Sequence, residues 1–308
     1  TNQKRERVEW RRGPFSVRND YVADDVWRDL TNGALGYRLV AQFQTPRLLP
    51  WAYRPPLSYA CVNPPVQVFA REDRAEGAAP LTAWETAPHN PPVGPVLNMT
   101  HVMPVSDLPT DRQAAQMVDQ YQNAYWLDGF RDGVIGPPGG SGEPVEGLKG
   151  AWDFVGVNYY SRTLVRAGPP PSGIAMPPPP EGAETSTMGW EVYPEGFYHC
   201  LKRAASYGVP VYITENGIGT DDDEQRCRYI VRHLAQARRA IGEGADIRSY
   251  LHWCFQDNFE WVLGYGQKFG LFERPAPSLE RVPKGSAHMF REIARANGVP
   301  AEMAERYL

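Results

Sequence analysis

The sequence lacks any apolar stretch long enough to span a bilayer, and no signal-peptide pattern opens it. It also lacks a strong charge of either sign. Its 32 basic and 36 acidic side chains give a formal net charge of −4, without long runs of one sign. A membrane partner and a nucleic-acid partner are therefore not indicated. We expect a cytoplasmic protein.

Cysteine is scarce, with Cys61, Cys200, Cys227 and Cys254 scattered along the chain and no CxxC pair. This pattern favours buried free thiols in a reducing compartment over zinc ligands or disulfides. No cluster of metal ligands and no phosphate-binding glycine loop is visible, so neither a metal nor a cofactor is expected. The chain begins at Thr1 rather than at a methionine, which leaves open that upstream sequence exists.

The overall amino-acid composition is that of a globular protein. The 308 residues are 42% hydrophobic and 22% charged, which is enough to build a substantial core. The chain carries 9 Trp and 16 Tyr. Aromatic rings supply the flat apolar faces that carbohydrate sites use, although protein cores use them too.

Strands and helices are predicted to alternate from about residue 94 onward. The strands are expected over 94–100, 152–160, 209–214 and 247–255, and the helices from Thr110 to about Tyr125 and over 196–207, 224–241 and 284–297. The first of these helices is predicted to begin with a capping box of Thr110 and Gln113. The segment 170–187 is too rich in proline to be regular and is expected to be a long exposed loop.

Two of the helices show an apolar stripe. In the first, the stripe comprises Ala114, Met117, Val118, Tyr121 and Tyr125. In the helix over 224–241 it comprises Cys227, Ile230, Val231, Leu234 and Ile241, with Gly242 as the expected end.

This alternation predicts an α/β fold with a parallel sheet or a (β/α)8 barrel of the TIM type. Four β/α units can be counted in residues 94–308. A strand-plus-helix unit takes roughly 30 residues, so the first 93 residues are too few for four more units. We therefore predict one barrel-type domain over 1–308, with a recognisable second half over 94–308 and an abbreviated or divergent first half over 1–93.

The strongest chemical signal is VYITENGIG at 211–219. A strand ends at Thr214 and Glu215, and the chain then turns at Asn216 and Gly217. In a barrel this places the Glu215 carboxylate at the carboxyl-terminal mouth, where barrel active sites lie. A carboxylate there can attack an anomeric carbon and form a glycosyl-enzyme ester. A loop glutamate paired with an arginine is the alternative reading of this motif taken alone.

The motif TENG resembles the nucleophile motif of family 1 glycoside hydrolases, and three other blocks agree with that family in order and approximate spacing. They are DFVGVNYYSR at 153–162, HWCFQDNFEW at 252–261 and GYGQKFGLF at 264–272. The segment 282–298 resembles the family's final helix. The resemblance covers residues 94–308. It implies a retaining β-glycosidase that hydrolyses a small β-glycoside or oligosaccharide, with β-glucosides and β-galactosides as the expected substrates.

The resemblance also assigns roles at the site. It implies Glu215 as nucleophile, Asn158 in the glycone subsite, Tyr160 as a hydrogen-bond donor to the nucleophile, Trp253 as the platform under the sugar, Glu260 and Trp261 as partners of its outer hydroxyls, and Phe269 as the residue that closes the pocket. The chemistry is consistent with these roles, because a sugar presents apolar C–H faces and a rim of hydroxyls.

A retaining glycosidase also needs an acid/base carboxylate, which this family carries in a Thr-x-Asn-Glu-Pro motif. The motif is absent from the 308 residues. The segment 59–70 keeps Asn63 and Pro65 but has Pro64 where the glutamate would stand. Gln42, in 41–49, stands where the family has a sugar-binding histidine, and 8–12 faintly resembles its second strand.

No acid/base residue can therefore be named, since Glu85 is better read as a surface loop glutamate. Two alternatives stay open beside the enzyme. One is a non-catalytic or truncated relative that keeps only sugar binding. The other is a half-barrel that covers its exposed sheet edge with a partner chain or by self-association.

Overall fold

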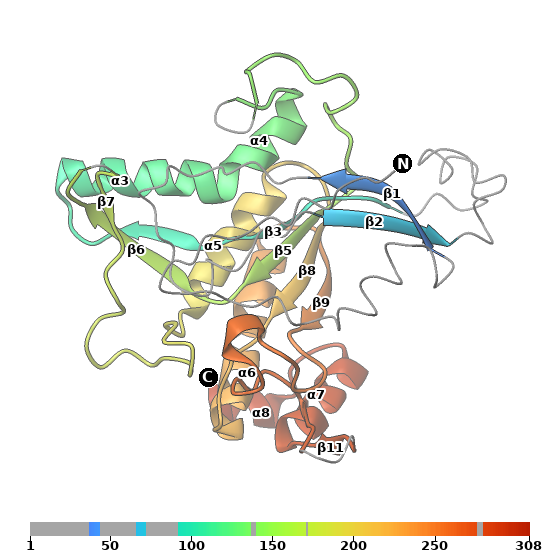
Figure 1. Ribbon diagram of the computed structural model, residues 1–308. Helices are drawn as coiled ribbons and strands as arrows, with labels where there is room; N and C mark the ends of the chain where they lie inside the picture. The colour runs from blue at the N-terminus through green and yellow to red at the C-terminus, as the bar shows by residue number, and fades with distance from the viewer. Residues whose placement is uncertain (1–36, 44–65, 72–91, 137–139, 171, 276–279) are drawn as a thin grey trace. The chain divides into compact units, whose positions relative to one another are not determined.

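The computed structural model describes residues 37–43, 66–71, 92–136, 140–170, 172–275 and 280–308 (Figure 1). The chain divides into two compact units, one of residues 1–46 and 55–90 and one of residues 47–54 and 91–308. The prediction of a single barrel-type domain over 1–308 stays a prediction.

In the first unit, β1 (Tyr37–Phe43) pairs antiparallel with β2 (Val66–Arg71). Neighbouring strands of a β/α barrel run parallel, so this pair does not reproduce the expected barrel arrangement. The segment 8–12, Asn63, Pro64, Pro65 and Glu85 lie outside the described residues, and Gln42 is described only in its backbone, within β1.

The second unit contains a four-stranded sheet in the order β3-β5-β8-β9, in which all three pairings are parallel (Figure 1). Its strands are β3 (Val96–Asn98), β5 (Val155–Tyr159), β8 (Val211–Asn216) and β9 (Ile247–His252). Each lies within or overlaps a predicted strand. Because all four are parallel, their carboxyl ends meet along one edge of the sheet, and Asn158, Tyr160, Glu215 and Trp253 lie at or directly after these ends.

Two of the sheet strands continue into a second, three-stranded sheet. β4 (His101–Pro104) follows β3 and β6 (Arg162–Ala167) follows β5, and β4 and β6 again pair parallel. β7 (Ile174–Ala175) adds to β6 antiparallel within the segment predicted to be a loop. A short antiparallel pair, β10 (Phe272–Glu273) and β11 (Val282–Pro283), lies near the end of the chain.

The helices connect and cover these strands. They are α3 (Pro109–Asp119), the π-helical segment η3 (Gln120–Ala124), α4 (Tyr125–Asp132), α5 (Pro194–Ala205), α6 (Asp223–Gly242), the 3-10 turn η4 (Trp261–Leu263), α7 (Gly285–Ala296) and α8 (Ala301–Tyr307). The helix α8 was not predicted. Within the described residues, no helix combines the length and the apolar character that crossing a bilayer requires.

The predicted capping box at Thr110 is wrong. The helix begins one residue earlier, with Leu108 as N-cap, Pro109 in the first turn and no side-chain cap. Proline is favoured there because its fixed φ suits the helix start and its missing N–H would be unpaired anyway. The predicted apolar stripe is also wrong at Met117, which is 56% exposed. The π-helical segment 120–124 changes the helical phase, so residues on either side of it do not share one face.

The main core lies between the sheet and the helices α5 and α6. Val155, Val157 and Tyr159 of β5 and Val211 and Ile213 of β8 are at most 1% exposed and belong to one cluster with apolar side chains of these helices. In both strands these residues occupy alternate positions, as expected for one face of a sheet. The other face therefore carries Gly156, Asn158 and Thr214.

The helix α6 ends at Gly242, as predicted, but its buried face is wider than the predicted stripe. Cys227, Ile230 and Val231 are buried, whereas Ile241 is 41% exposed. Three residues with polar groups that the pattern did not flag, Arg226, Tyr229 and His233, are also buried on this helix. Cys200, Cys227 and Cys254 are buried free thiols, as predicted, and Cys61 lies outside the described residues.

Candidate active site

A β-bulge in β8 determines where Glu215 points. Val157 of β5 lies opposite Ile213, but the next residue, Asn158, lies opposite Glu215. Thr214 is therefore an extra residue, with no partner of its own on β5. Successive side chains of a strand alternate between faces, and without the bulge Glu215 would share the helix-packed face of Ile213. The extra residue turns Glu215 to the face of Asn158.

A direct hydrogen bond joins Glu215 to Tyr160. The Tyr160 hydroxyl donates a short hydrogen bond to Oε2 of Glu215. Thr214 donates its hydroxyl to Oδ1 of Asn158 over 2.7 Å, which leaves the amide nitrogen of Asn158 as a donor. Asn158 stabilises the Glu215 carboxylate in that way. The structure therefore brings together Glu215, Tyr160 and Asn158.

Burial and hydrogen bonding act in opposite directions on the nucleophile candidate. Burial raises the pKa of the Glu215 carboxyl above its ordinary value, and the hydrogen bonds from Tyr160 and Asn158 offset part of that rise. Burial also raises the pKa of the Tyr160 phenol, and the nearby charge of Glu215 adds to the increase. Tyr160 therefore stays protonated and remains a hydrogen-bond donor.

The carboxylate of Glu260 lies close enough to Glu215 for their charges to interact. Burial raises the pKa of Glu260, and the negative charge of Glu215 adds to the rise. Glu260 precedes a tight turn in which its N–H donates to the carbonyl of Gly264 over 2.7 Å. Trp261 follows with φ 44° and is 56% exposed. Glu260 thus joins the cluster, whereas Trp261 lies at the surface.

A buried ion pair anchors the loop that carries Glu260. Asp257 is 5% exposed, accepts the N–H of Gly270 over 2.9 Å and accepts the Lys284 ammonium over 3.0 Å. Lys284 in turn donates to the carbonyl of Gly270 over 2.8 Å. These contacts tie the loop start to its end and to the beginning of α7. Sequence reasoning gave Asp257 and Lys284 no role, because an ion pair 27 residues apart leaves no local pattern.

Trp253 and Gly217 hold the ends of β8 and β9 together. The N–H of Trp253 donates to the carbonyl of Asn216 over 3.0 Å, so the half-buried Trp253 follows directly on the strand pairing beside Glu215. The peptide between Trp253 and Cys254 is cis. A Cβ on Gly217 would lie 1.7 Å from the carbonyl oxygen of Trp253. The glycine of the TENG motif is therefore required by the close approach of two backbones.

We expect Gly217→Ala to lower the free energy of unfolding by about 3 kcal/mol or more, since the clashing atom belongs to the backbone and cannot rotate away. Gly242→Ala is the matched control, because a Cβ there meets nothing within 4 Å. Its expected effect is neutral or stabilising by up to about 1 kcal/mol. Urea unfolding of both variants checks this. Equal midpoints for the two variants would contradict the assigned role of Gly217.

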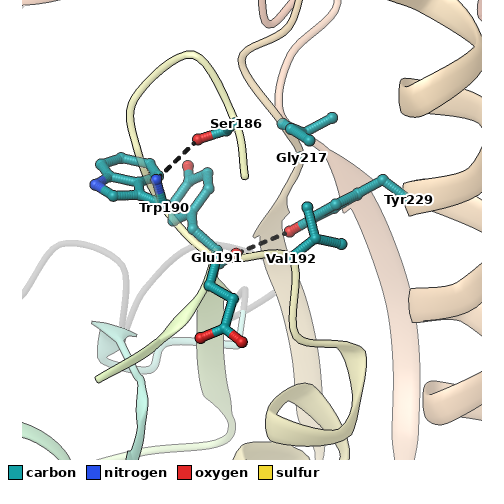
Figure 2. A pocket seen from close by; sticks show the side chains of 8 residues that line it. Ser186, Trp190, Glu191, Val192, Gly217 and Tyr229 are labelled. Carbon is teal, nitrogen blue, oxygen red and sulfur yellow. Dashed lines mark hydrogen bonds between the residues drawn. The ribbon is translucent and has the colours of Figure 1, made fainter. Parts of the chain in front are cut away.

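Aromatic rings surround Tyr160 on its other side. Phe269 is 1% exposed, with its ring centroid 6.2 Å from that of Tyr160, and Trp190 lies 5.4 Å from the same ring. Trp190 lines a pocket with Tyr160, Gly217 and Tyr229. The main-chain N–H of Trp190 donates to the Ser186 hydroxyl over 3.2 Å (Figure 2). The predicted role of Phe269, closing the sugar pocket, stays a prediction.

Glu191, next to Trp190, is held by Arg162 at the start of β6. The guanidinium donates to both carboxylate oxygens, over 2.7 Å and 2.8 Å, and both side chains are largely buried. The guanidinium also lies 4.0 Å above the ring of Tyr193. This pair fixes the segment that carries Trp190 to the strand that follows Tyr160. The proline-rich sequence before Trp190 suggested only a loop and gave no sign of this anchor.

Among the described residues, no group of three His, Cys, Asp or Glu side chains is arranged to hold a metal ion. The site so far consists of two carboxylates, a tyrosine donor, an amide and a surrounding layer of aromatic rings at the carboxyl ends of parallel strands. Such an arrangement can bind a polyhydroxylated ring and present a carboxylate nucleophile to it.

Comparison with known proteins shows which family the chain resembles. Residues 141–299 match the model of glycosyl hydrolase family 1. The chain is 37% identical over 207 residues to a β-galactosidase of Sulfolobus acidocaldarius, covering 63% of this chain and 41% of that protein. It is 35% identical over 234 residues to a β-galactosidase of Saccharolobus solfataricus, covering 69% and 45%.

Solved structures give the same picture. A β-glycosidase from Pyrococcus horikoshii superposes with a TM-score of 0.66 at 38% identity, over 73% of this chain and 53% of that one. A β-glucosidase from Thermotoga maritima in complex with glucoimidazole gives a TM-score of 0.63 at 29% identity, over 71% and 54%. The chain thus spans less than half the length of these two β-galactosidases and about half that of these two solved structures.

The fold is that of a glycosidase-type (β/α)8 barrel, of which this chain shows the carboxyl-terminal part. The chain belongs to glycosyl hydrolase family 1. Both the predicted family and the predicted fold class, with its last four units clear, are confirmed.

Proposed function

We propose that this chain carries the nucleophile half of a retaining β-glycosidase site that acts on β-glucosides or β-galactosides. The observation that supports the proposal is the cluster at the end of β8, where Tyr160 and Asn158 stabilise the Glu215 carboxylate beside Glu260. The names of the relatives, β-galactosidase and β-glucosidase, agree with this substrate class.

In the proposed reaction the Glu215 carboxylate attacks the anomeric carbon while the bond to the aglycone oxygen breaks. The product of this step is an ester between the sugar and Glu215, which water then hydrolyses. Glu215 must be ionised to attack. The hydrogen bonds from Tyr160 and Asn158 keep its pKa below the value that burial alone would impose.

The remaining predicted residues bind the substrate in this proposal. Trp253 forms the apolar platform for the sugar ring, and Glu260 accepts hydrogen bonds from its hydroxyls. Trp261 supplies a further contact from the surface turn, and Phe269 packs behind Tyr160. No acid/base residue is assigned, and the protonation of the leaving group is not attributed to any described residue.

Covalent labelling tests the proposal. A dinitrophenyl 2-deoxy-2-fluoro-β-glucoside forms the glycosyl-enzyme without needing a general acid, because dinitrophenolate leaves unprotonated. We expect intact mass spectrometry to show one added sugar and peptide mapping to place it on Glu215. A folded chain without an adduct would overturn the proposal.

The second candidate is a relative that binds sugar without turnover, favoured by the absence of a Thr-x-Asn-Glu-Pro motif from these residues. Glucoimidazole, which one of the Thermotoga maritima structures contains, distinguishes the two. Calorimetric binding of glucoimidazole without any labelling of Glu215 supports the second candidate. A melting temperature that rises with protein concentration would show in addition that the folded chain associates.

A further inference from the structure

Asn216 follows the bulge, and its side chain points to the face opposite Glu215. It is fully buried, and its amide forms hydrogen bonds with residues of two strands, β5 and β9, and of the helix α6. The nitrogen donates to the carbonyl of Tyr159 over 2.8 Å and to the hydroxyl of Tyr229 over 3.0 Å, and the oxygen accepts the hydroxyl of Tyr250 over 2.9 Å. Asn216 therefore replaces pairings that the bulge removes from the sheet.

Among the described residues, Tyr229 is the only helix residue that takes part in this hydrogen-bond network. Its side chain extends from α6 (Figure 2) and is 2% exposed. Its hydroxyl donates to the carbonyl of Tyr160 over 3.3 Å. The ring stacks on His233 with centroids 3.7 Å apart. Nδ1 of His233 donates to the carbonyl of Tyr229 over 2.8 Å. Burial lowers the pKa of His233 to about 3, so this ring is neutral and its contact with Tyr229 is constant near neutral pH.

These contacts close a ring of bonds around the nucleophile. Glu215 is joined covalently to Asn216, Asn216 donates to Tyr229, and Tyr229 donates to the main chain of Tyr160. The side chain of Tyr160 then donates to Glu215. Of the four residues in this ring, Glu215 and Asn216 belong to β8 and Tyr160 follows directly after β5. Tyr229 alone lies on a helix.

We propose that Tyr229, acting through Asn216 and the main chain of Tyr160, is a positioning residue that fixes the hydrogen bond between Tyr160 and Glu215. The inference rests on the proposed function of Glu215 as nucleophile. It assigns a role to a helix residue outside every motif that carries the family resemblance.

The physical reason is the sensitivity of a hydrogen bond to geometry. The main-chain carbonyl of Tyr160 accepts the hydrogen bond from the Tyr229 hydroxyl. Loss of that hydroxyl therefore releases the main chain from which the Tyr160 side chain extends. A weaker bond from Tyr160 stabilises the carboxylate of Glu215 less. The pKa of Glu215 then rises, whereas loss of a buried hydroxyl elsewhere lowers stability without changing that pKa.

Other titratable groups surround this ring and must be distinguished in the measurement. Among the described residues, Glu260 faces Glu215 from the loop after β9, and Tyr250 and His252 lie beside Asn216 on β9. Burial lowers the pKa of His252 to about 3, so its charge does not change near neutral pH. Burial raises the pKa of Glu260 as it raises that of Glu215, so Glu260 requires its own signal.

The test compares Tyr229→Phe with Tyr159→Phe. Tyr159 is also fully buried and also donates its hydroxyl to a carbonyl, that of Tyr193 over 2.6 Å, but this hydroxyl lies outside the ring. Carbon-13 labelling of glutamate carboxyls allows the pKa of Glu215 to be measured by NMR, with Glu215→Gln and Glu260→Gln assigning the two signals. This readout requires no catalytic activity.

We expect Tyr229→Phe to raise the pKa of Glu215 by about half a pH unit or more, and Tyr159→Phe to change it by less than about 0.2. Tyr250→Phe, which removes the hydrogen bond to Asn216 Oδ1, should shift it in the same direction and provides a second variant should Tyr229→Phe fold poorly. An unchanged pKa in the folded variants, or an equal shift in Tyr159→Phe, would overturn the proposal. Absence of labelling in the wild-type chain would remove the nucleophile role alone, and the NMR comparison would still decide the positioning role.

Discussion

Glu215→Gln should form no adduct with the dinitrophenyl 2-deoxy-2-fluoro-β-glucoside, and hydrolysis of dinitrophenyl β-glucoside should fall by about 10⁴-fold or more, as for other covalent nucleophiles. A carboxamide is neutral and does not form the glycosyl ester. It has the shape of the carboxylate, and its oxygen can still accept the hydrogen bond from Tyr160. The variant therefore isolates charge and nucleophilicity from packing. Intact mass and initial rates check the expectation.

Glu184→Gln is the matched control. Glu184 lies on the segment before Trp190 and is partly buried. Its carboxylate pairs with Arg232 over 3.1 Å, and its side chain takes part in none of the contacts described for the site. It should label at the wild-type rate. A Glu215→Gln chain that still gained one sugar would place the nucleophile elsewhere. Urea unfolding of both variants shows whether any loss reflects the site rather than the fold.

The second large effect concerns the leaving group. Because no Thr-x-Asn-Glu-Pro motif is present, we expect the chain to retain activity on dinitrophenyl glycosides and to be weak on glycosides whose leaving oxygen must be protonated. The missing general acid costs about 10²–10⁴-fold on the latter substrates. Rates on dinitrophenyl β-glucoside and on cellobiose, measured with one preparation, give the ratio directly.

Azide provides the control for the second half of the reaction. Without a general base, water attacks the glycosyl-enzyme slowly, whereas the azide anion needs no deprotonation. Azide forms a bond to the anomeric carbon and releases the Glu215 carboxylate, so it should raise turnover of dinitrophenyl β-glucoside and yield a β-glycosyl azide. Ordinary cellobiose turnover that azide does not change would show that an acid/base group is present after all.

Local sequence was enough for the regular elements of residues 94–308. The four parallel strands lie within or overlap the predicted ranges, and α5, α6 and α7 begin and end within two residues of them. These elements carry strong periodicity and clear stops, such as Gly242 at the end of α6. The first helix was predicted less well at Thr110 and Met117. The effects responsible, a proline in its first turn and a π-helical segment, do not follow from a 3.6-residue pattern.

The motifs that carry the site were likewise visible in the sequence, because each is continuous in the chain. Their order indicated the family, which the comparisons confirm. Glu215, Asn158 and Tyr160 could be named as one set although 57 residues separate Asn158 from Glu215. The resemblance to the family assigned them to one site, and parallel strands, which place their carboxyl ends at one edge, explain why residues so far apart can meet.

The sequence by itself therefore determined the family, the parallel direction of the strands and which residues follow each strand. Only the tertiary structure decided the face on which Glu215 lies, because simple alternation from Ile213 would direct it toward the helices. The bulge at Thr214 reverses that direction, and Asn216 and Tyr229 satisfy the backbone and amide groups around it. The bulge depends on pairing with two neighbouring strands and on a hydrogen bond to a helix. Such long-range contacts leave no periodic pattern in the sequence.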